Sequence, residues 1–199
     1  MSGTFPATIG ITKFKLESRT PTMVSITQSG RRDVRQVGGQ RWVMSGTMAT
    51  MNQSDYKEYF AFMASQNGRY EAFSFVSPDM ATPEGVATGT PLVVGAHSLG
   101  DTTISTDGWT TTVTGIMKAG DLIKFAGHNK VYIVTADANS VAGATTLTIF
   151  PALLETLANN EAITVSSVPF TVMMQNDNFD YNVSAPTNYS QQIAFIEVI

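Results

Sequence analysis

Residues 40–78, QRWVMSGTMATMNQSDYKEYFAFMASQNGRYEAFSFVSP, decide the fold of this chain. They predict a strand, a short link, one amphipathic helix and a returning strand over residues 70–76. In the first strand Trp42 and Met44 alternate with Arg41, Val43 and Ser45, as side chains do in a strand that faces two environments. Asn52 or Ser54 is the predicted N-cap of the helix. The helix ends at Asn-Gly, residues 67–68, because glycine adopts the left-handed conformation of a C-cap.

The predicted helix, residues 54–66, has one aromatic face. Its apolar residues recur at helical spacing, and its polar residues occupy the face left for water. The apolar set is Tyr56, Tyr59, Phe60 and Met63, and the polar set is Lys57, Glu58, Ser65 and Gln66. We therefore expect the helix to pack across a β-sheet and close its core, a role that needs no chemistry.

Composition narrows the classes of function. Hydrophobic residues make up 43% of the 199 residues and charged residues only 14%, which suits a β-rich protein with much of its surface committed to partners. The absence of cysteine excludes a disulfide framework, a thiolate metal site and a cysteine nucleophile. No apolar leader and no run of about 20 apolar residues is present, so we expect a soluble, unexported product. We expect no cofactor.

The charges are unevenly distributed. Residues 1–80 carry a net +3, residues 81–168 a net −4 and residues 169–199 a net −3. Such a basic end and an acidic end on one small subunit favour head-to-tail or ring contacts between copies.

Two strands are predicted before the central stretch, over residues 11–17 and 23–28. In the second, Val24 and Ile26 are expected to face inward. An arginine-rich segment follows at residues 31–41, RRDVRQVGGQR. One interpretation is a contact with a polyanion such as nucleic acid. We favour the other, a solvated strand or hairpin whose arginines pair with acids of a neighbouring subunit, because the arginines are not interleaved with the aromatic residues that single-stranded nucleic-acid binding requires. The candidate intersubunit or lumen contacts are Arg31, Arg32, Arg35 and Arg41.

Residues 79–168 predict a small antiparallel β-barrel or sandwich. Threonine-rich apolar runs recur there at the close spacing of short strands, over residues 92–94, 101–106, 110–114, 121–125, 130–135, 144–150 and 161–166. His128 is expected in water at the tip of the hairpin formed by residues 127–129, and no second histidine near it suggests a metal site.

Strands are also predicted over residues 170–175, 179–183 and 191–199, and these need partners. Their natural partners lie in residues 11–76. We therefore expect residues 1–78 and 169–199 to form one discontinuous β-sandwich domain with one helix, interrupted by an inserted domain over residues 79–168. Pro78 and Pro169 mark the two crossings.

Few residues point to catalysis or ligand binding. Phosphate-binding, dinucleotide-binding and nucleophile-elbow motifs are missing from the sequence. A chance pair of carboxylates, Asp121 with Asp137, is the form that a glycosidase site would take, but turn aspartates are far commoner. Trp109 and Tyr132 are candidate glycan-contact aromatics, and the alternative for Trp109 is a buried plug of a small barrel. We expect no enzymatic activity.

Two segments resemble proteins of long-tailed bacteriophages. The strand with RWV, the helix of the form YxxYFAFM and the sequence NGRYEAFSFVSP resemble the distal tail protein, which forms a ring at the end of the tail tube. The segment from GDLIKF through KVY and TLTIFPALLETL resembles the small β-domain inserted in many phage tail proteins. The resemblance implies a structural virion protein of the tail tip, made in the host cytoplasm. It also implies a hexameric ring that joins the tail-tube protein to the hub or baseplate protein, with DNA passing through its lumen.

Two alternatives stay open at this point. The chain is a tail-tube or other minor tail subunit if its copies polymerise into stacks. It is a carbohydrate-binding module used in host adsorption if Trp109 or Tyr132 lies on an exposed face.

Overall fold

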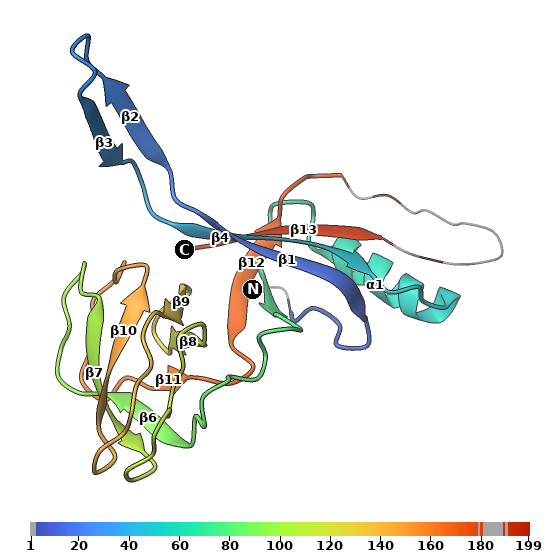
Figure 1. Cartoon of the computed structure of the whole chain (residues 1–199). Coiled ribbons are helices and arrows are strands. Elements are labelled where there is room, and N and C mark those ends of the chain that lie inside the picture. The colour runs from blue at the N-terminus through green and yellow to red at the C-terminus, as the bar shows by residue number, and fades with distance from the viewer. Residues whose placement is uncertain (1–2, 179, 181–188, 190) are drawn as a thin grey trace.

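The computed structural model describes residues 3–178, 180, 189 and 191–199. Its central element is an antiparallel sheet in the order β1-β4-β13-β12-β5 (Figure 1). The two C-terminal strands lie between β4 and β5, so strands from both ends of the chain pair with each other, as expected. The bounds are β1 (Ile11–Arg19), β4 (Arg41–Met48), β5 (Phe73–Val76), β12 (Pro169–Met174) and β13 (Gln192–Glu197).

The described residues form one helix, α1 (Gln53–Ser65). Its N-cap is Asn52, whose side chain accepts a hydrogen bond from the backbone N–H of Asp55 at 2.9 Å. Asn67 and Gly68 follow it with φ angles of 52° and 68°, which is the predicted left-handed stop. Tyr56, Tyr59 and Met63 are buried. Phe5 packs among the helix and the sheet, with ring centroids 6.2 Å from Tyr59 and 5.4 Å from Phe75.

A second antiparallel sheet has the order β11-β8-β9-β10-β7-β6. A bridge between Leu92 of β6 and Ala162, next to β11, brings its two edges together, so the sheet curls into a barrel with its own apolar core. The bounds are β6 (Gly89–Val93), β7 (Thr103–Trp109), β8 (Leu122–Phe125), β9 (Val131–Val134), β10 (Thr145–Phe150) and β11 (Ile163–Thr164). The predicted mainly-β fold with one helix is confirmed.

The strands β2 (Thr22–Ile26) and β3 (Arg32–Gln36) pair only with each other. We call this hairpin, residues 22–36, the arm. It projects away from both larger sheets (Figure 1). Every residue of its two strands is exposed. The inward placement expected for Val24 and Ile26 is therefore wrong: their side chains are 45% and 70% exposed, because no second layer formed by the described residues covers the hairpin.

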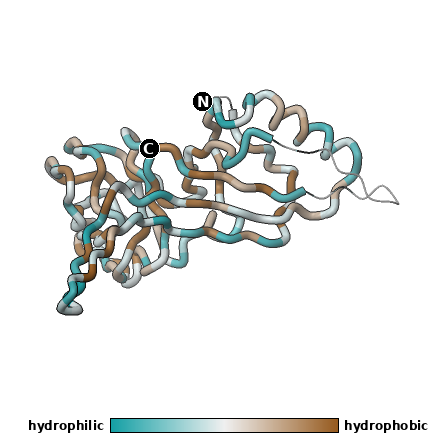
Figure 2. The backbone as a smooth tube through the Cα atoms, turned by 90° about the horizontal axis from the view of Figure 1, so that it is seen from above, coloured by the Kyte–Doolittle hydropathy of each residue, from teal (hydrophilic) through white to brown (hydrophobic). Residues whose placement is uncertain are grey.

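Figure 2 shows hydrophilic and hydrophobic stretches interspersed along the backbone. Buried residues alternate with more exposed ones in strands such as β5 and β13, and this alternation is the pattern that made them predictable. Two further local predictions differ from the structure. Residues 110–114 form no strand. Gln66 is buried, and its side-chain amide donates to the Phe62 carbonyl at 3.1 Å. The strand predicted over residues 179–183 lies outside the described residues, apart from Asp180.

Candidate functional site

The arm carries three of the four arginines that the sequence singled out. Arg32 and Arg35 lie on β3, and Arg31 lies at the turn before it. Their guanidinium groups form no ion pair within the part of the chain that the structure describes. Arg41 lies elsewhere, at the start of β4, where it pairs in register with Arg19 of β1. The sequence cluster is therefore divided between the arm and the central sheet.

The register of the arm gives its two faces different character. Residues directly opposite in an antiparallel pair share a face. Val24 therefore lies beside Val34, and Ile26 beside Arg32, on one face. Met23 lies beside Arg35 on the other. Exposed apolar side chains next to unpaired guanidinium groups are typical of interaction surfaces.

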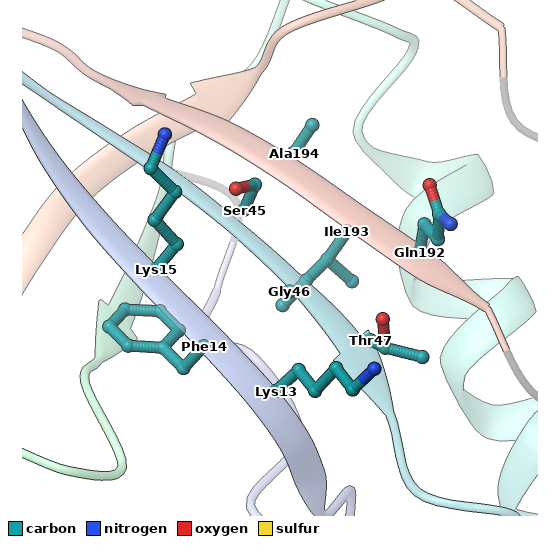
Figure 3. Close-up of a pocket in the computed structure, with 9 residues that line it drawn as sticks. All are labelled: Lys13, Phe14, Lys15, Ser45, Gly46, Thr47, Gln192, Ile193 and Ala194. Carbon is teal, nitrogen blue, oxygen red and sulfur yellow. The ribbon is translucent and has the colours of Figure 1, made fainter.

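The outer face of the central sheet carries a shallow hollow of about 320 Å³ (Figure 3). Its polar lining comes from Lys13 and Lys15 of β1, Ser45 and Thr47 of β4 and Gln192 of β13. Gly46 in its floor permits close approach of β1, since a Cβ at this position would lie 2.6 Å from the Lys13 carbonyl oxygen. None of the nine lining residues is a carboxylate or a histidine. This hollow therefore has no acid–base pair for catalysis.

The barrel is fastened to the central sheet by a buried polar cluster, which we call the clamp: Gln40, Trp42, Lys130, Val131 and Glu197. Lys130 Nζ donates to the Glu197 carboxylate and to Gln40 Oε1, the latter at 2.6 Å. The other Glu197 oxygen accepts from the Val131 N–H at 2.9 Å. Trp42 Nε1 donates to the Val131 carbonyl at 2.8 Å. The Lys130 and Glu197 side chains are 1% and 0% exposed, so the ion pair is closed to water.

Burial shifts the pKa values of the two charged residues of the clamp, Lys130 and Glu197, toward their neutral forms. It raises the pKa of Glu197 and lowers the pKa of Lys130, and in each case the charge of the partner opposes the shift. The core surrounding the clamp also spans both sheets, because Leu122 and Val131 of the barrel belong to the same apolar cluster as Trp42 and Phe195. The clamp thus joins the two sheets by buried hydrogen bonds and an ion pair, within an apolar core that both sheets share.

Sequence reasoning missed the clamp, although one signal was present. Glu197 follows Ile193 and Phe195 in the inward phase of the last strand. A carboxylate at an inward position needs a buried cation or several N–H donors. The sequence did not reveal that Lys130, in the inserted segment, supplies that cation.

The two candidate glycan-contact aromatics lie inside the barrel. Trp109 is 4% exposed and donates from Nε1 to Thr106 Oγ1 at 2.8 Å. Tyr132 is 0% exposed, and its hydroxyl lies 3.1 Å from His128 Nδ1. A sugar stacks on an exposed ring face, and neither ring offers one. His128 is 5% exposed, so its expected place in water is wrong: its ring packs edge-on against Phe125, with centroids 5.7 Å apart.

The carboxylates considered for a glycosidase site hold loops together instead. Asp121 accepts backbone hydrogen bonds from Glu84, Gly85 and Lys118 at 2.7, 3.1 and 2.7 Å. Asp137 pairs with Lys118 Nζ at 2.8 Å and accepts from the Ala119 N–H at 3.0 Å. Both groups are therefore engaged by one turn, residues 118–119, rather than facing each other across a cleft.

The described ranges contain no group of three or more histidine, aspartate or glutamate side chains placed to hold a metal ion. Within the same ranges, no helix has the length and apolar character to cross a membrane.

Comparison with known proteins assigns the barrel. None of the curated proteins matches the chain. Residues 81–168 match the family model described as distal tail protein pb9, B domain. These residues include every strand of the barrel, from β6 to β11. The match confirms the resemblance for this segment: residues 81–168 are similar to the B domain of a bacteriophage distal tail protein, which supports a structural role in the phage tail.

Proposed function

We propose that copies of this chain form a closed, hexameric ring at the distal end of the tail tube, where the ring connects the tube to the tail-tip hub or baseplate. Residues 1–78 and 169–199 are the ring-forming belt domain, and residues 79–168 are the inserted domain. The protein is made in the host cytoplasm and acts in the virion as a structural part rather than as an enzyme.

The arm is the observation that carries this proposal. It exposes Met23, Val24, Ile26 and Val34 at 61%, 45%, 70% and 51%. A two-stranded hairpin is marginally stable in water without a further layer. Contact with another copy would cover these apolar side chains and pair the arm's arginines. Arg31, Arg32 and Arg35 are accordingly assigned to intersubunit or lumen contacts, and Arg41, on the central sheet, to the same class of contact.

The charge distribution favours head-to-tail contacts between copies. Three arginines and Asp33 give the arm a net +2, whereas residues 81–168 carry a net −4. Head-to-tail contacts between unlike surfaces generate a ring when the rotation closes. One rim of such a ring would bind the tail-tube protein and the other the hub protein, and DNA would pass through the lumen.

The test is the mass of the purified protein by light scattering, with negative-stain images of the same sample. A closed ring of about six copies supports the proposal. Replacing residues 22–37 by a short Gly-Ser turn should leave a folded monomer, since the arm packs on no other element. Extended stacks would instead identify a tail-tube subunit. A strict monomer at all concentrations, with or without purified tail-tube protein, would overturn the proposal.

A further inference from the structure

A groove with an acidic rim lies at the junction between the two sheets. One hollow, of about 380 Å³, is lined by residues that include Met80, Glu84 and Leu122. A second, also of about 380 Å³, is lined by residues of β1 and by Pro78. Both hollows include Asp79, so they adjoin there. We call the two hollows together the Asp79 groove.

The groove combines apolar side chains with negative charge, and its exposed lining is more polar than apolar. Ile11, Phe14, Met80 and Leu122 contribute apolar surface. The exposed Asp79 and Glu84 lie along it, together with the buried Asp121. The nearby Lys118 is paired with Asp137, so its charge is already balanced.

The arm has the complementary character. The face formed by Val24, Ile26, Arg32 and Val34 combines three apolar side chains with a guanidinium group. Arg35 on the other face and Arg31 at the turn add positive charge. All of these residues are exposed, and so are Pro78 and Asp79. Among the described residues, nothing covers the arm, and Asp79, Thr82 and Glu84 of the groove are exposed.

We infer that the arm of one copy seats in the Asp79 groove of the next copy, with the arm's arginines facing Asp79 and Glu84. This inference rests on the proposed ring and names the surface that receives the arm. The contact joins two unlike surfaces, so each copy would donate one arm and accept one. Apolar burial would supply affinity, and the opposite charges would select the register.

The absence of cysteine permits a direct test, because any introduced pair of cysteines is unique. A Val34→Cys variant is mixed with a Thr82→Cys variant, and the mixture is oxidised. Thr82 is exposed and lines the groove. A disulfide-linked dimer between unlike variants is expected. Ile26→Cys provides a second arm position, and Leu99→Cys, 67% exposed on the barrel, replaces Thr82→Cys as the matched control.

Charge reversal provides the second readout. Asp79→Arg with Glu84→Arg should weaken self-association by about tenfold or more, because like charges would then meet at the contact. Arg32→Glu with Arg35→Glu should do the same. Combining all four changes in one chain should restore association, and circular dichroism of each variant checks that the fold is kept.

The outcomes separate this inference from the ring proposal. Suppose that rings form, but that neither Val34→Cys nor Ile26→Cys cross-links to Thr82→Cys more than to the Leu99→Cys control. That result would overturn the inference and leave the ring proposal intact. Cross-linked chains that never close would support the inference and overturn the hexameric ring. A monomer that shows no cross-link would overturn both.

Discussion

Lys130 of the barrel and Glu197 of the central sheet form a buried ion pair, although they lie 67 positions apart in the sequence. The pair sits among Gln40, Trp42 and Val131, which contribute its remaining hydrogen bonds. This cluster fixes how the barrel is held against the central sheet.

Lys130→Met should destabilise the fold strongly. The change leaves the Glu197 carboxylate buried without a cation, which costs about 3–5 kcal/mol in comparable cases. The free energy of unfolding in urea measures the loss. Lys130→Met combined with Glu197→Gln should be more stable than Lys130→Met alone, because the amide carries no charge and still accepts a hydrogen bond. Lys15→Met, in the exposed pair with Glu17, is the control and should change nothing measurable. A loss no greater than that of the control would contradict the assignment of the clamp.

Trp42→Phe should also weaken the junction. The phenyl ring keeps most of the packing but leaves the buried Val131 carbonyl without its donor, at a cost of about 1–3 kcal/mol. Urea unfolding again gives the magnitude. In the same measurement, Trp42→Phe combined with Lys130→Met should depart from additivity, since both residues belong to one cluster. Strict additivity would mean that the two contacts are independent.

Asp121→Ala should loosen the segment that enters the barrel. The carboxylate accepts three backbone N–H groups, two of them from Glu84 and Gly85, and losing it costs about 2 kcal/mol or more. Amide hydrogen exchange should accelerate at Glu84, Gly85 and Lys118. Asp137→Ala is the matched control, because that carboxylate is exposed and accepts one backbone N–H. Unchanged exchange at Glu84 and Gly85 would show that the loop is held by other contacts.

Ionisation of the Tyr132 hydroxyl should lower the free energy of unfolding at alkaline pH. Burial raises its pKa from 10.0 to about 12, so the folded state keeps a proton that the unfolded chain releases. Its contribution to the free energy of unfolding is therefore complete below pH 10 and is lost as the pH rises toward about 12. Unfolding in urea across this range measures the slope, and Tyr132→Phe should reduce it. The remaining slope includes the contribution of the buried Tyr59, whose pKa is also raised. An equal slope in both proteins would exclude Tyr132 as its source.

The helix and most strands were predictable because their signals are local. The helix signals all lie within one segment: the N-cap Asn52, the Tyr and Met residues at helical spacing, and Gly68. The structure places α1 within one residue of the predicted bounds. The barrel strands repeat at short spacing, and the order of the motifs GDLIKF, KVY and TLTIFPALLETL led separately to the resemblance that the family model confirms for residues 81–168. The arm could not be predicted in the same way. The alternation in β2 is that of a half-buried strand, yet every residue of β2 is exposed in the part of the chain that the structure describes.

Local sequence patterns were enough to predict the mainly-β class, the helix, the arginine-rich hairpin and the likeness to phage tail proteins. Each depends on neighbouring residues or on residue order. The burial of Trp109 and Tyr132, the separation of Arg41 from the arm and the pairing of Lys130 with Glu197 became known only from the folded chain. These facts depend on contacts between distant segments, and no local pattern specifies which buried charge will find which partner.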